Sequence, residues 1–319
     1  MSHLQITLEK DARLLTDQAF LNLIQKRIKE LLISSGPPQE IFDYIQQNSG
    51  KMLRPMLVYL VYQLCNGDDL NAVVDVASGV ELIHIASLIH DDIIDQSNLR
   101  RGTQTIHSRY GVSVAVLAGD FLFAKAFSVF TTYNEYKILS LMTDVICQMC
   151  AGEIEQLVKP GQTEAYYWRY IFKKTACLIG SACKAGALLG KNISQELIAN
   201  LESFGHYLGY AFQLVDDILD YLPISDRLGK EIGDDYQEGL WTLPIIRGVA
   251  QGYLTRSWRT DYSRAEITKL LEEAGILQEI YQEAEHYIER ALALLDSFPE
   301  HPAKLKLQQI AEFVCRRSY

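Results

Sequence analysis

The sequence is poor in features that would place it in several common protein classes. Its six cysteines among 319 residues do not form a disulfide framework, and Cys147 and Cys150 are a lone C-x-x-C without a second pair at metal-ligand spacing. Positive charge is also scarce. The formal net charge of −10 argues against a nucleic-acid partner or a general anionic-membrane surface. Any anion must therefore bind at local basic clusters.

Long uninterrupted apolar runs and an N-terminal targeting pattern are missing as well. Asp120, Lys125 and Lys184 interrupt the most apolar stretches, which predicts that the chain has no transmembrane segment. The segment from Met1 to Leu15 mixes acids and bases and does not resemble a signal peptide. The hydrophobic content of 48% is typical of a globular protein, and the cysteine usage favours a cytoplasmic location.

Helical periodicity runs along almost the whole chain. Apolar residues recur at spacings of three and four, and the breaks between these segments are rich in Gly, Pro and Asn. No strand-like alternation, internal repeat or linker stands out. We therefore expect an all-α fold, a single large helix bundle with a central cavity that forms one domain over residues 1–319. The expected helical segments are 19–32, 41–45, 55–64, 72–95, 112–133, 138–158, 168–189, 195–221 and 267–295.

Six aspartates share one spacing, D-D-x-x-D, inside apolar runs. They are Asp91, Asp92 and Asp95, and then Asp216, Asp217 and Asp220. On a helix, each set spans an arc of roughly 100°, so its carboxylates point to one side. Burying such acids is costly unless a cation binds them, and Mg²⁺ is the usual ion when a substrate brings phosphates. Helix capping or a solvated face is the alternative reading, and the presence of two such sets argues against it.

Basic residues accompany the acids. They are Lys51 and Arg54, Arg100 and Arg101, Lys173 and Lys174, and Lys230. Any one of them alone is compatible with an ordinary surface cation. Together they predict two kinds of phosphate site, one that uses metal held by aspartate and one that uses Arg and Lys directly.

The chain resembles the trans-isoprenyl diphosphate synthase family over nearly its whole length. Within that family it is most similar to medium- and long-chain synthases such as component 2 of heptaprenyl diphosphate synthase. The matching segments, in the family's order, are GKMLRP (50–55), ELIHIASLIHDDIID (81–95), LRRGTQTIH (99–107), GEIEQ (152–156), KKTACLIG (173–180), FGHYLGYAFQLVDDILD (204–220), LGKEIGDD (228–235) and TLP (242–244).

The resemblance implies an activity and its partners. The expected reaction is a head-to-tail (1′-4) condensation of isopentenyl diphosphate onto an allylic diphosphate, which gives an all-trans polyprenyl diphosphate. It implies an isoprenoid-synthase fold and about three Mg²⁺ ions with substrate bound. A homodimer is the expected assembly, with a heterodimer that includes a small regulatory subunit as the alternative.

The resemblance also implies roles for single residues. Asp91, Asp92 and Asp95 would form the first Mg²⁺ site, and Asp216, Asp217 and Asp220 the second. The allylic diphosphate would contact Arg100, Lys174, Thr175, Gln213 and Lys230, and isopentenyl diphosphate would contact Lys51, Arg54, His84 and Arg101. One departure is Leu240, which stands where many relatives have a lysine and would loosen one diphosphate contact.

Two other functions fit parts of the pattern. A terpene cyclase shares the first cluster and the fold, but it normally has an N/D-D-x-x-S/T-x-x-x-E second site, whereas Asp220 completes a second D-D-x-x-D here. A non-catalytic subunit that sets product length tends to lose the aspartates, and this chain keeps all six. Both alternatives are therefore less consistent with the sequence than a prenyltransferase.

Small residues precede the first acidic cluster. Ser87 and Ala86 lie four and five positions before Asp91, roughly 6–7.5 Å further back along a helix. An aromatic ring at this level would block a growing prenyl chain. We therefore expect products of at least C20, with C30 to C40 favoured, long enough to associate with a membrane. The alternative is that Phe123 or Phe127 closes the tunnel instead.

Overall fold

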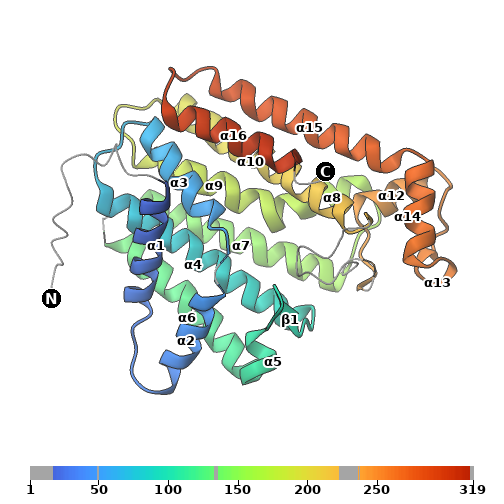
Figure 1. Ribbon diagram of the computed structural model, residues 1–319, viewed down its shortest axis with the longest axis horizontal. Helices are drawn as coiled ribbons and strands as arrows, with labels where there is room; N and C mark the ends of the chain where they lie inside the picture. Colours follow the sequence, from blue (N-terminus) through green and yellow to red (C-terminus); the bar gives the residue numbers. More distant parts are fainter. Residues whose placement is uncertain (1–16, 49, 133–135, 223–235, 237, 317–319) are drawn as a thin grey trace.

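Helices carry almost all the regular structure, as the periodicity predicts (Figure 1). The computed structural model describes residues 17–48, 50–132, 136–222, 236 and 238–316. The strands within these ranges are β1 (Leu99–Arg100) and β2 (Thr103–Gln104), which pair antiparallel. The expected all-α fold is confirmed.

The helices fall into two groups along the chain. The first group is α1 (Asp17–Leu31), α2 (Pro37–Gln47), α3 (Leu53–Leu64), α4 (Leu70–Ile94), α5 (Ile106–Tyr110), α6 (Val112–Thr131) and α7 (Tyr136–Val158). The second is α8 (Glu164–Ile171), a π-helical turn (Phe172–Ala176), α9 (Cys177–Leu188), α10 (Gln195–Leu219), α12 (Leu243–Ala250), α13 (Trp258–Asp261), α14 (Arg264–Glu273), α15 (Ile276–Leu295) and α16 (Pro302–Arg316).

The core has two parts that share α3 and α9. One part collects buried side chains from α1 to α7 around α4, and the other collects side chains from α8 and α10 to α16 around α10. Helices α3 and α9 contribute to both parts. They cross so closely that a Cβ at Gly186 would lie 2.3 Å from the carbonyl oxygen of Val58. This contact joins the two halves of the bundle.

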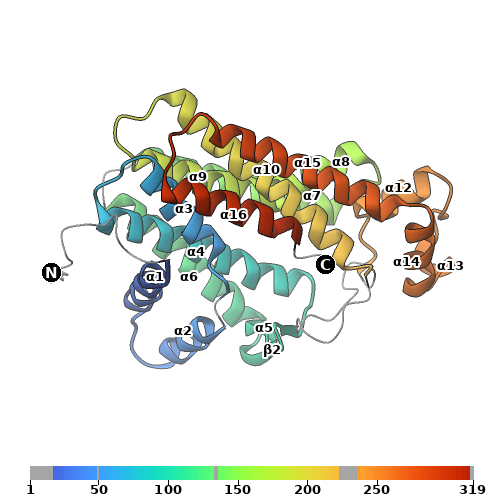
Figure 2. The same cartoon turned by 45° about the horizontal axis from the view of Figure 1, so that its top comes forward.

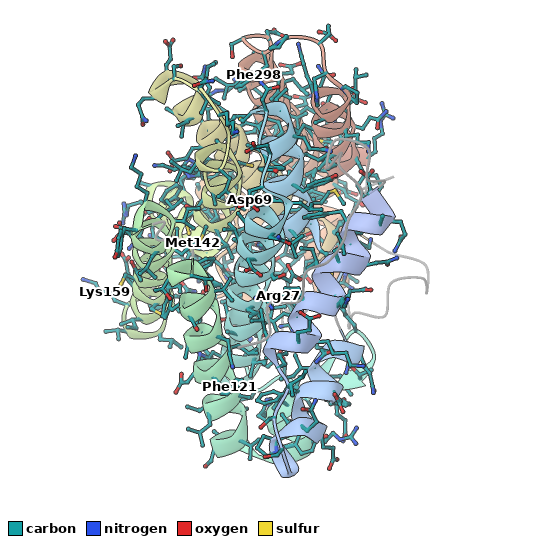
Figure 3. The ribbon with its side chains drawn as sticks, turned by 90° about the vertical axis from the view of Figure 1, so that its left-hand side faces the viewer. Arg27, Asp69, Phe121, Met142, Lys159 and Phe298 are labelled. Atoms are coloured by element: carbon teal, nitrogen blue, oxygen red, sulfur yellow. The ribbon has the colours of Figure 1, made fainter. Side chains whose placement is uncertain are left out.

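The two longest helices, α4 and α10, both begin at a side-chain cap. Asp69 accepts a hydrogen bond from the backbone N–H of Ala72, and Ser194 accepts one from that of Leu197. Helix α1 is attached to α4 by Arg27, whose Nε donates to Asp75 at 2.5 Å. Figure 3 labels Arg27 on α1 and Asp69, the N-cap of α4. The caps and this ion pair fix where α4 starts and what covers it.

The structure differs from the expected elements at several places. The segment 267–295 is broken at Gly275, whose φ of 74° is left-handed, so that α14 and α15 are separate helices. Helices α5, α12, α13 and α16 were not expected. The first three have 5, 8 and 4 residues, too few for a clear periodic pattern, whereas the amphipathic pattern of the 15-residue α16 was detectable and was missed. The β1–β2 hairpin was also missed, because two-residue strands carry no alternation to detect.

Two helices are apolar enough, by length and composition, to cross a membrane. They are α4, whose most apolar window is 72% buried, and α6, whose window is only 33% buried. Asp120 and Lys125 therefore do not take α6 out of this class by composition, and the expected absence of a transmembrane segment stays a prediction. The burial of α4 is that of a core helix, whereas the exposed apolar face of α6 requires another explanation.

Candidate active site

The two acidic clusters lie at the same end of the bundle. Helices α4 and α10 run in the same direction in both views (Figures 1 and 2). The aspartates stand at the C-terminal end of each helix. Asp95 is the C-cap of α4 and Asp220 is the C-cap of α10. Because the C-terminal end of a helix is the negative end of its dipole, acids there are unfavourable without a cation. This position rules out N-terminal capping as their role.

The middle acid of each cluster is held by protein side chains. Asp92 is 4% exposed and accepts a 2.7 Å hydrogen bond from Nε of Arg100. Asp217 is 2% exposed and accepts hydrogen bonds from the Tyr167 hydroxyl at 2.7 Å and the Gln213 amide at 2.8 Å. The first and last acids of each cluster are less buried. Both clusters therefore present acids one helical turn apart on the less buried side.

Burial raises the affinity of these acids for protons. It raises the pKa of Asp91 to about 7, against the opposing effect of Lys174, and it raises the pKa of Asp217 to about 7, against the hydrogen bonds from Tyr167 and Gln213. A bound cation would favour the ionised form of both groups instead.

The residues present fit Mg²⁺. They offer only oxygen ligands, and Mg²⁺ is commonly bound by one or two carboxylates together with substrate phosphates. Over the described ranges, no three His, Cys, Asp or Glu side chains converge into a complete metal cage. The remaining ligands would therefore come from a diphosphate and from water.

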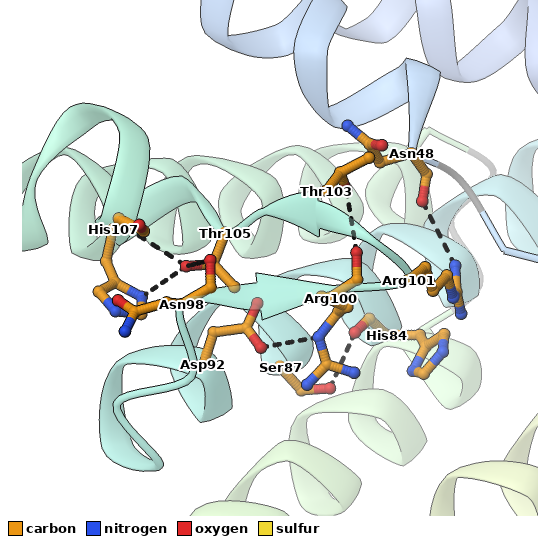
Figure 4. A network of polar contacts seen from close by, with 11 residues as sticks. Asn48, His84, Ser87, Asp92, Asn98, Arg100, Arg101, Thr103, Thr105 and His107 are labelled. Atoms are coloured by element: carbon orange, nitrogen blue, oxygen red, sulfur yellow. Dashed lines mark hydrogen bonds and ion pairs between the residues drawn. The ribbon is translucent and has the colours of Figure 1, made fainter. Parts of the chain in front are cut away.

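The β1–β2 hairpin carries two neighbouring arginines that make different contacts (Figure 4). Its two-residue loop, Arg101–Gly102, has positive φ at both positions, 54° and 76°, as hairpin loops of this length favour. Arg100 turns back to Asp92, whereas Arg101 donates to the backbone oxygen of Asn48 at 3.3 Å. A Cβ at Gly50 would lie 2.7 Å from Nη2 of Arg101, so this glycine allows the guanidinium to approach.

A buried charged cluster lies beside Arg101. Nη1 of Arg54 donates to Nε2 of His84 at 3.1 Å, and burial followed by the charge of Arg54 holds the pKa of His84 well below its usual value. His84 is therefore neutral. Glu81 is 2% exposed, and burial raises its pKa to about 7. Within the described part of the chain, Nε of Arg54 and Oε2 of Glu81 have no hydrogen-bond partner.

These residues adjoin a pocket between α2, α4 and the hairpin. It contains about 600 Å³ of empty space, part of it open to solvent, and Glu81, His84, Asp92, Arg100 and Arg101 line it. Its basic groups and its apolar wall suit an anion that has a short hydrocarbon part. The sequence analysis did not single out Glu81, although an acid three positions before His84 in an apolar helix was a detectable signal.

The π-helical turn places Lys174 and Thr175. Nζ of Lys174 donates to the Tyr170 hydroxyl at 2.9 Å, whereas Nζ of the neighbouring Lys173 reaches Glu155 of α7 at 2.7 Å. The Thr175 hydroxyl donates to the Gln213 amide oxygen at 2.7 Å, and the same amide holds Asp217. Such turns interrupt the ordinary helical register and occur often at functional sites. Lys174 is thus directed to the acids and Lys173 away from them.

The remaining residues with predicted roles either make few contacts that bear on those roles or lie outside the described residues. Lys51 is exposed before α3, and Lys230 lies outside the described residues. Ala86 is fully buried, and the Ser87 hydroxyl donates to the backbone oxygen of His84 at 2.9 Å. Leu240 is partly buried.

The aromatic residues of α6 occupy different depths. Phe123 and Phe127 are partly buried. Phe130 packs deeper, with its ring only 2.5 Å from where a Cβ of Gly79 would be. Gly79 lies twelve residues before Asp91, about 18 Å along α4. Phe130 therefore packs against α4 far below the acids, whereas Phe123 lies near their level, with its ring centre 5.8 Å from that of His90.

Comparisons with known proteins identify the family of this chain. The profile of the family described as Polyprenyl synthetase matches residues 38–282. The chain belongs to this family. It is 35% identical to the octaprenyl diphosphate synthase of Escherichia coli strain K12 over 286 residues, which cover 86% of this chain and 88% of the relative.

A second relative and a solved structure are similarly close. Component 2 of the Geobacillus stearothermophilus heptaprenyl diphosphate synthase is 33% identical, over 89% of this chain and 91% of the relative. A polyprenyl synthase from Caulobacter crescentus CB15, solved with calcium and isoprenyl diphosphate, has a TM-score of 0.86 at 31% identity, covering 95% of this chain and 96% of that one. The resemblance to isoprenyl diphosphate synthases is thus confirmed, and this polyprenyl synthetase is a trans-prenyltransferase.

Replacing Glu81 by Gln tests the buried charged cluster. The folded-state pKa of about 7 lies above the usual 4.5, so between these values the native state keeps a proton that the unfolded state releases. This group's contribution to stability is present below pH 4.5 and is lost as the pH rises through 7. We expect the free energy of unfolding of Glu81→Gln, relative to that of the wild type, to rise by up to about 3 kcal/mol between pH 4.5 and pH 8. Urea unfolding of both proteins at pH 4.5 and pH 8 measures the difference in their free energies of unfolding. A difference that is the same at both pH values would contradict the raised pKa of Glu81.

Proposed function

We propose that this prenyltransferase condenses isopentenyl diphosphate head-to-tail (1′-4) onto an allylic diphosphate with Mg²⁺. The product would be an all-trans polyprenyl diphosphate of C20 or longer, with C30 to C40 favoured. The observation that carries the proposal is the pair of acidic clusters at one end of α4 and α10, beside a pocket lined by Arg100 and Arg101. The octaprenyl and heptaprenyl products in the names of two relatives support the longer range.

The acids would hold the metal at the allylic site. Asp91 and Asp95 on α4, and Asp216 and Asp220 on α10, lie one helical turn apart within their clusters, and Asp92 and Asp217, which also accept hydrogen bonds from protein side chains, would complete the two sets of ligands. When bound, Mg²⁺ would neutralise the charge that develops on the departing diphosphate.

Side chains of the protein perform the remaining tasks. Lys174, Thr175 and Arg100 orient the allylic diphosphate, and Arg54, Arg101 and Lys51 bind the diphosphate of the second substrate without metal. Breaking the allylic C–O bond leaves a cation that the apolar walls shelter from water. The double bond of isopentenyl diphosphate attacks this carbon, and a proton then leaves to the departed diphosphate. Neutral His84 supports Arg54 as a hydrogen-bond acceptor.

A second copy of the chain is the proposed partner of α6. Large apolar side chains remain exposed on α6 at Val112, Val116 and Leu117 and on α7 at Ile154 and Leu157. A face of this kind is commonly covered by another protein surface. A small regulatory subunit is the alternative occupant. We also propose that residues 1–319 form one domain and that the protein is cytoplasmic.

Removing single acids tests the metal site. Asp91→Ala and Asp217→Ala should each lower turnover of isopentenyl diphosphate roughly a thousandfold or more, because the leaving group loses its charge partner. Asp296 is the matched control, since it is also a helix C-cap but lies on α15. Asp296→Ala should keep wild-type turnover. Wild-type activity in Asp91→Ala and Asp217→Ala would refute the metal site.

The length of the product tests the proposed tunnel. The wild type should make C30 to C40 products, and Ala86→Phe should stop near C15 or C20, because the ring would fill the space below the acids. Mass spectrometry of the products made from farnesyl diphosphate and isopentenyl diphosphate gives the result. Ala165→Phe, at an exposed position on α8, should leave the length unchanged. A wild type that stops at C15 would contradict the open tunnel but not the prenyltransferase activity.

The mass of the assembly tests the partner. Sedimentation equilibrium should show a dimer, and Leu117→Asp should shift it toward monomer, because a carboxylate would be buried in the interface. Leu305→Asp, at an exposed leucine of α16, should not. A monomeric wild type would exclude the homodimer, and a stable complex with a small separate subunit would then support the heteromer.

A further inference from the structure

Three side chains from α7, α8 and the π-helical turn form a closed polar triangle next to the first acidic cluster. The Tyr170 hydroxyl accepts from Nζ of Lys174 at 2.9 Å and donates to Oε1 of Glu153 at 3.3 Å. The third side of the triangle is the ion pair between Nζ of Lys174 and Oε1 of Glu153 at 3.7 Å. No role for Tyr170 or Glu153 follows from the diphosphate contacts proposed above.

The chain geometry explains how the triangle forms. Tyr170 and Lys174 are four positions apart, so a helical path brings them to one face. The ammonium of Lys174 also lies 5.3 Å from the centre of the Tyr170 ring, within cation–π range. Glu153 reaches this pair from the adjacent helix α7. One tyrosine therefore contacts the lysine through its ring and through its hydroxyl.

The electrostatics keep the lysine charged. Burial alone would lower the pKa of Lys174, but Tyr170, Glu153 and Asp91 more than offset this, and the pKa lies well above its ordinary value. The charge of Lys174 in turn opposes the effect of burial on the pKa of Asp91. The ammonium thus stands between the triangle and the acids of α4. A lysine has a long, flexible side chain, so holding it in one place before the substrate arrives saves ordering cost at binding.

We propose that Tyr170 is a positioning residue that, together with Glu153, holds the Lys174 ammonium in place for the allylic diphosphate. This inference rests on the proposed function, since it concerns the same diphosphate site. Tyr170 does not need to touch the substrate. It acts by limiting where the ammonium of Lys174 can be.

Tyr166 provides a matched control on the same helix. Its ring stacks on that of Tyr170, with centres 6.2 Å apart and planes 11° from parallel. Its hydroxyl donates to Oε1 of Gln156 on α7 at 2.8 Å. Tyr166→Phe therefore removes the same kind of α8–α7 hydrogen bond without touching Lys174. Any loss that is specific to Tyr170→Phe must come from the triangle.

The first experiment compares the two substitutions. Tyr170→Phe should raise the KM for the allylic diphosphate about three- to tenfold, the worth of one hydrogen bond, and leave the KM for isopentenyl diphosphate unchanged. Tyr166→Phe should change neither. Calorimetric titration of the full chain with inorganic diphosphate and Mg²⁺ should show the same loss of affinity for Tyr170→Phe alone. An unchanged affinity, or equal losses for both substrates and both variants, would overturn the proposal.

A double-mutant cycle shows whether Tyr170 acts through Lys174. In a Lys174→Met background, Tyr170→Phe should cause no further loss of diphosphate affinity, because there is no ammonium left to position. A full additional loss would mean that the hydroxyl acts otherwise, and the proposal would be wrong. If the wild type binds diphosphate but does not turn over isopentenyl diphosphate, the proposed function fails, while the titration still decides the role of Tyr170.

Discussion

The constraint on which the structure depends is the burial of carboxylates at the negative ends of two parallel helices. Burial raises the pKa of Asp91 and of Asp217, and the dipoles of α4 and α10 add to the cost. Packing alone does not offset that cost. Hydrogen bonds to Asp92 and Asp217 reduce it within the protein, and under the proposed function bound cations would offset the rest. The buried acids therefore favour cation binding at this end of α4 and α10.

The sequence predicted what depends on local pattern, and it missed what depends on neighbouring helices. The spacing of Asp91 to Asp95 placed the acids on one side of a helix, and the structure has them there. The partners of the middle acids could not be read from the chain, because Tyr167 lies 50 residues before Asp217 and meets it only when α8 packs near α10. The left-handed backbone conformation of Arg101 could not be predicted either, since arginine does not favour it.

The π-helical turn shows the same limit in another way. The sequence indicated continuous helix over 168–189, and helix does run through that segment, but its register changes at Phe172–Ala176. That change decides which of the adjacent lysines, Lys173 or Lys174, faces the acids. Periodicity cannot detect a single inserted residue within one turn. The resemblance predicts a diphosphate contact for Lys174 alone, and the sequence offered no geometric reason for choosing Lys174 over Lys173.

The two basic regions have different counter-charges, and under the proposed function this difference would explain why the allylic site uses metal and the other site does not. Lys174 is surrounded by anionic and phenolic oxygens from Glu153, Asp91 and Tyr170, so much of its charge is already balanced. Arg54 donates to a neutral histidine and lies near Glu81, whose pKa burial raises to about 7, so its counter-charge is only partial; burial lowers the pKa of Arg54. An incoming diphosphate at Arg54 therefore meets positive charge that lacks a full counter-charge. At Lys174 it meets a site rich in acids, where only additional cations make its binding favourable.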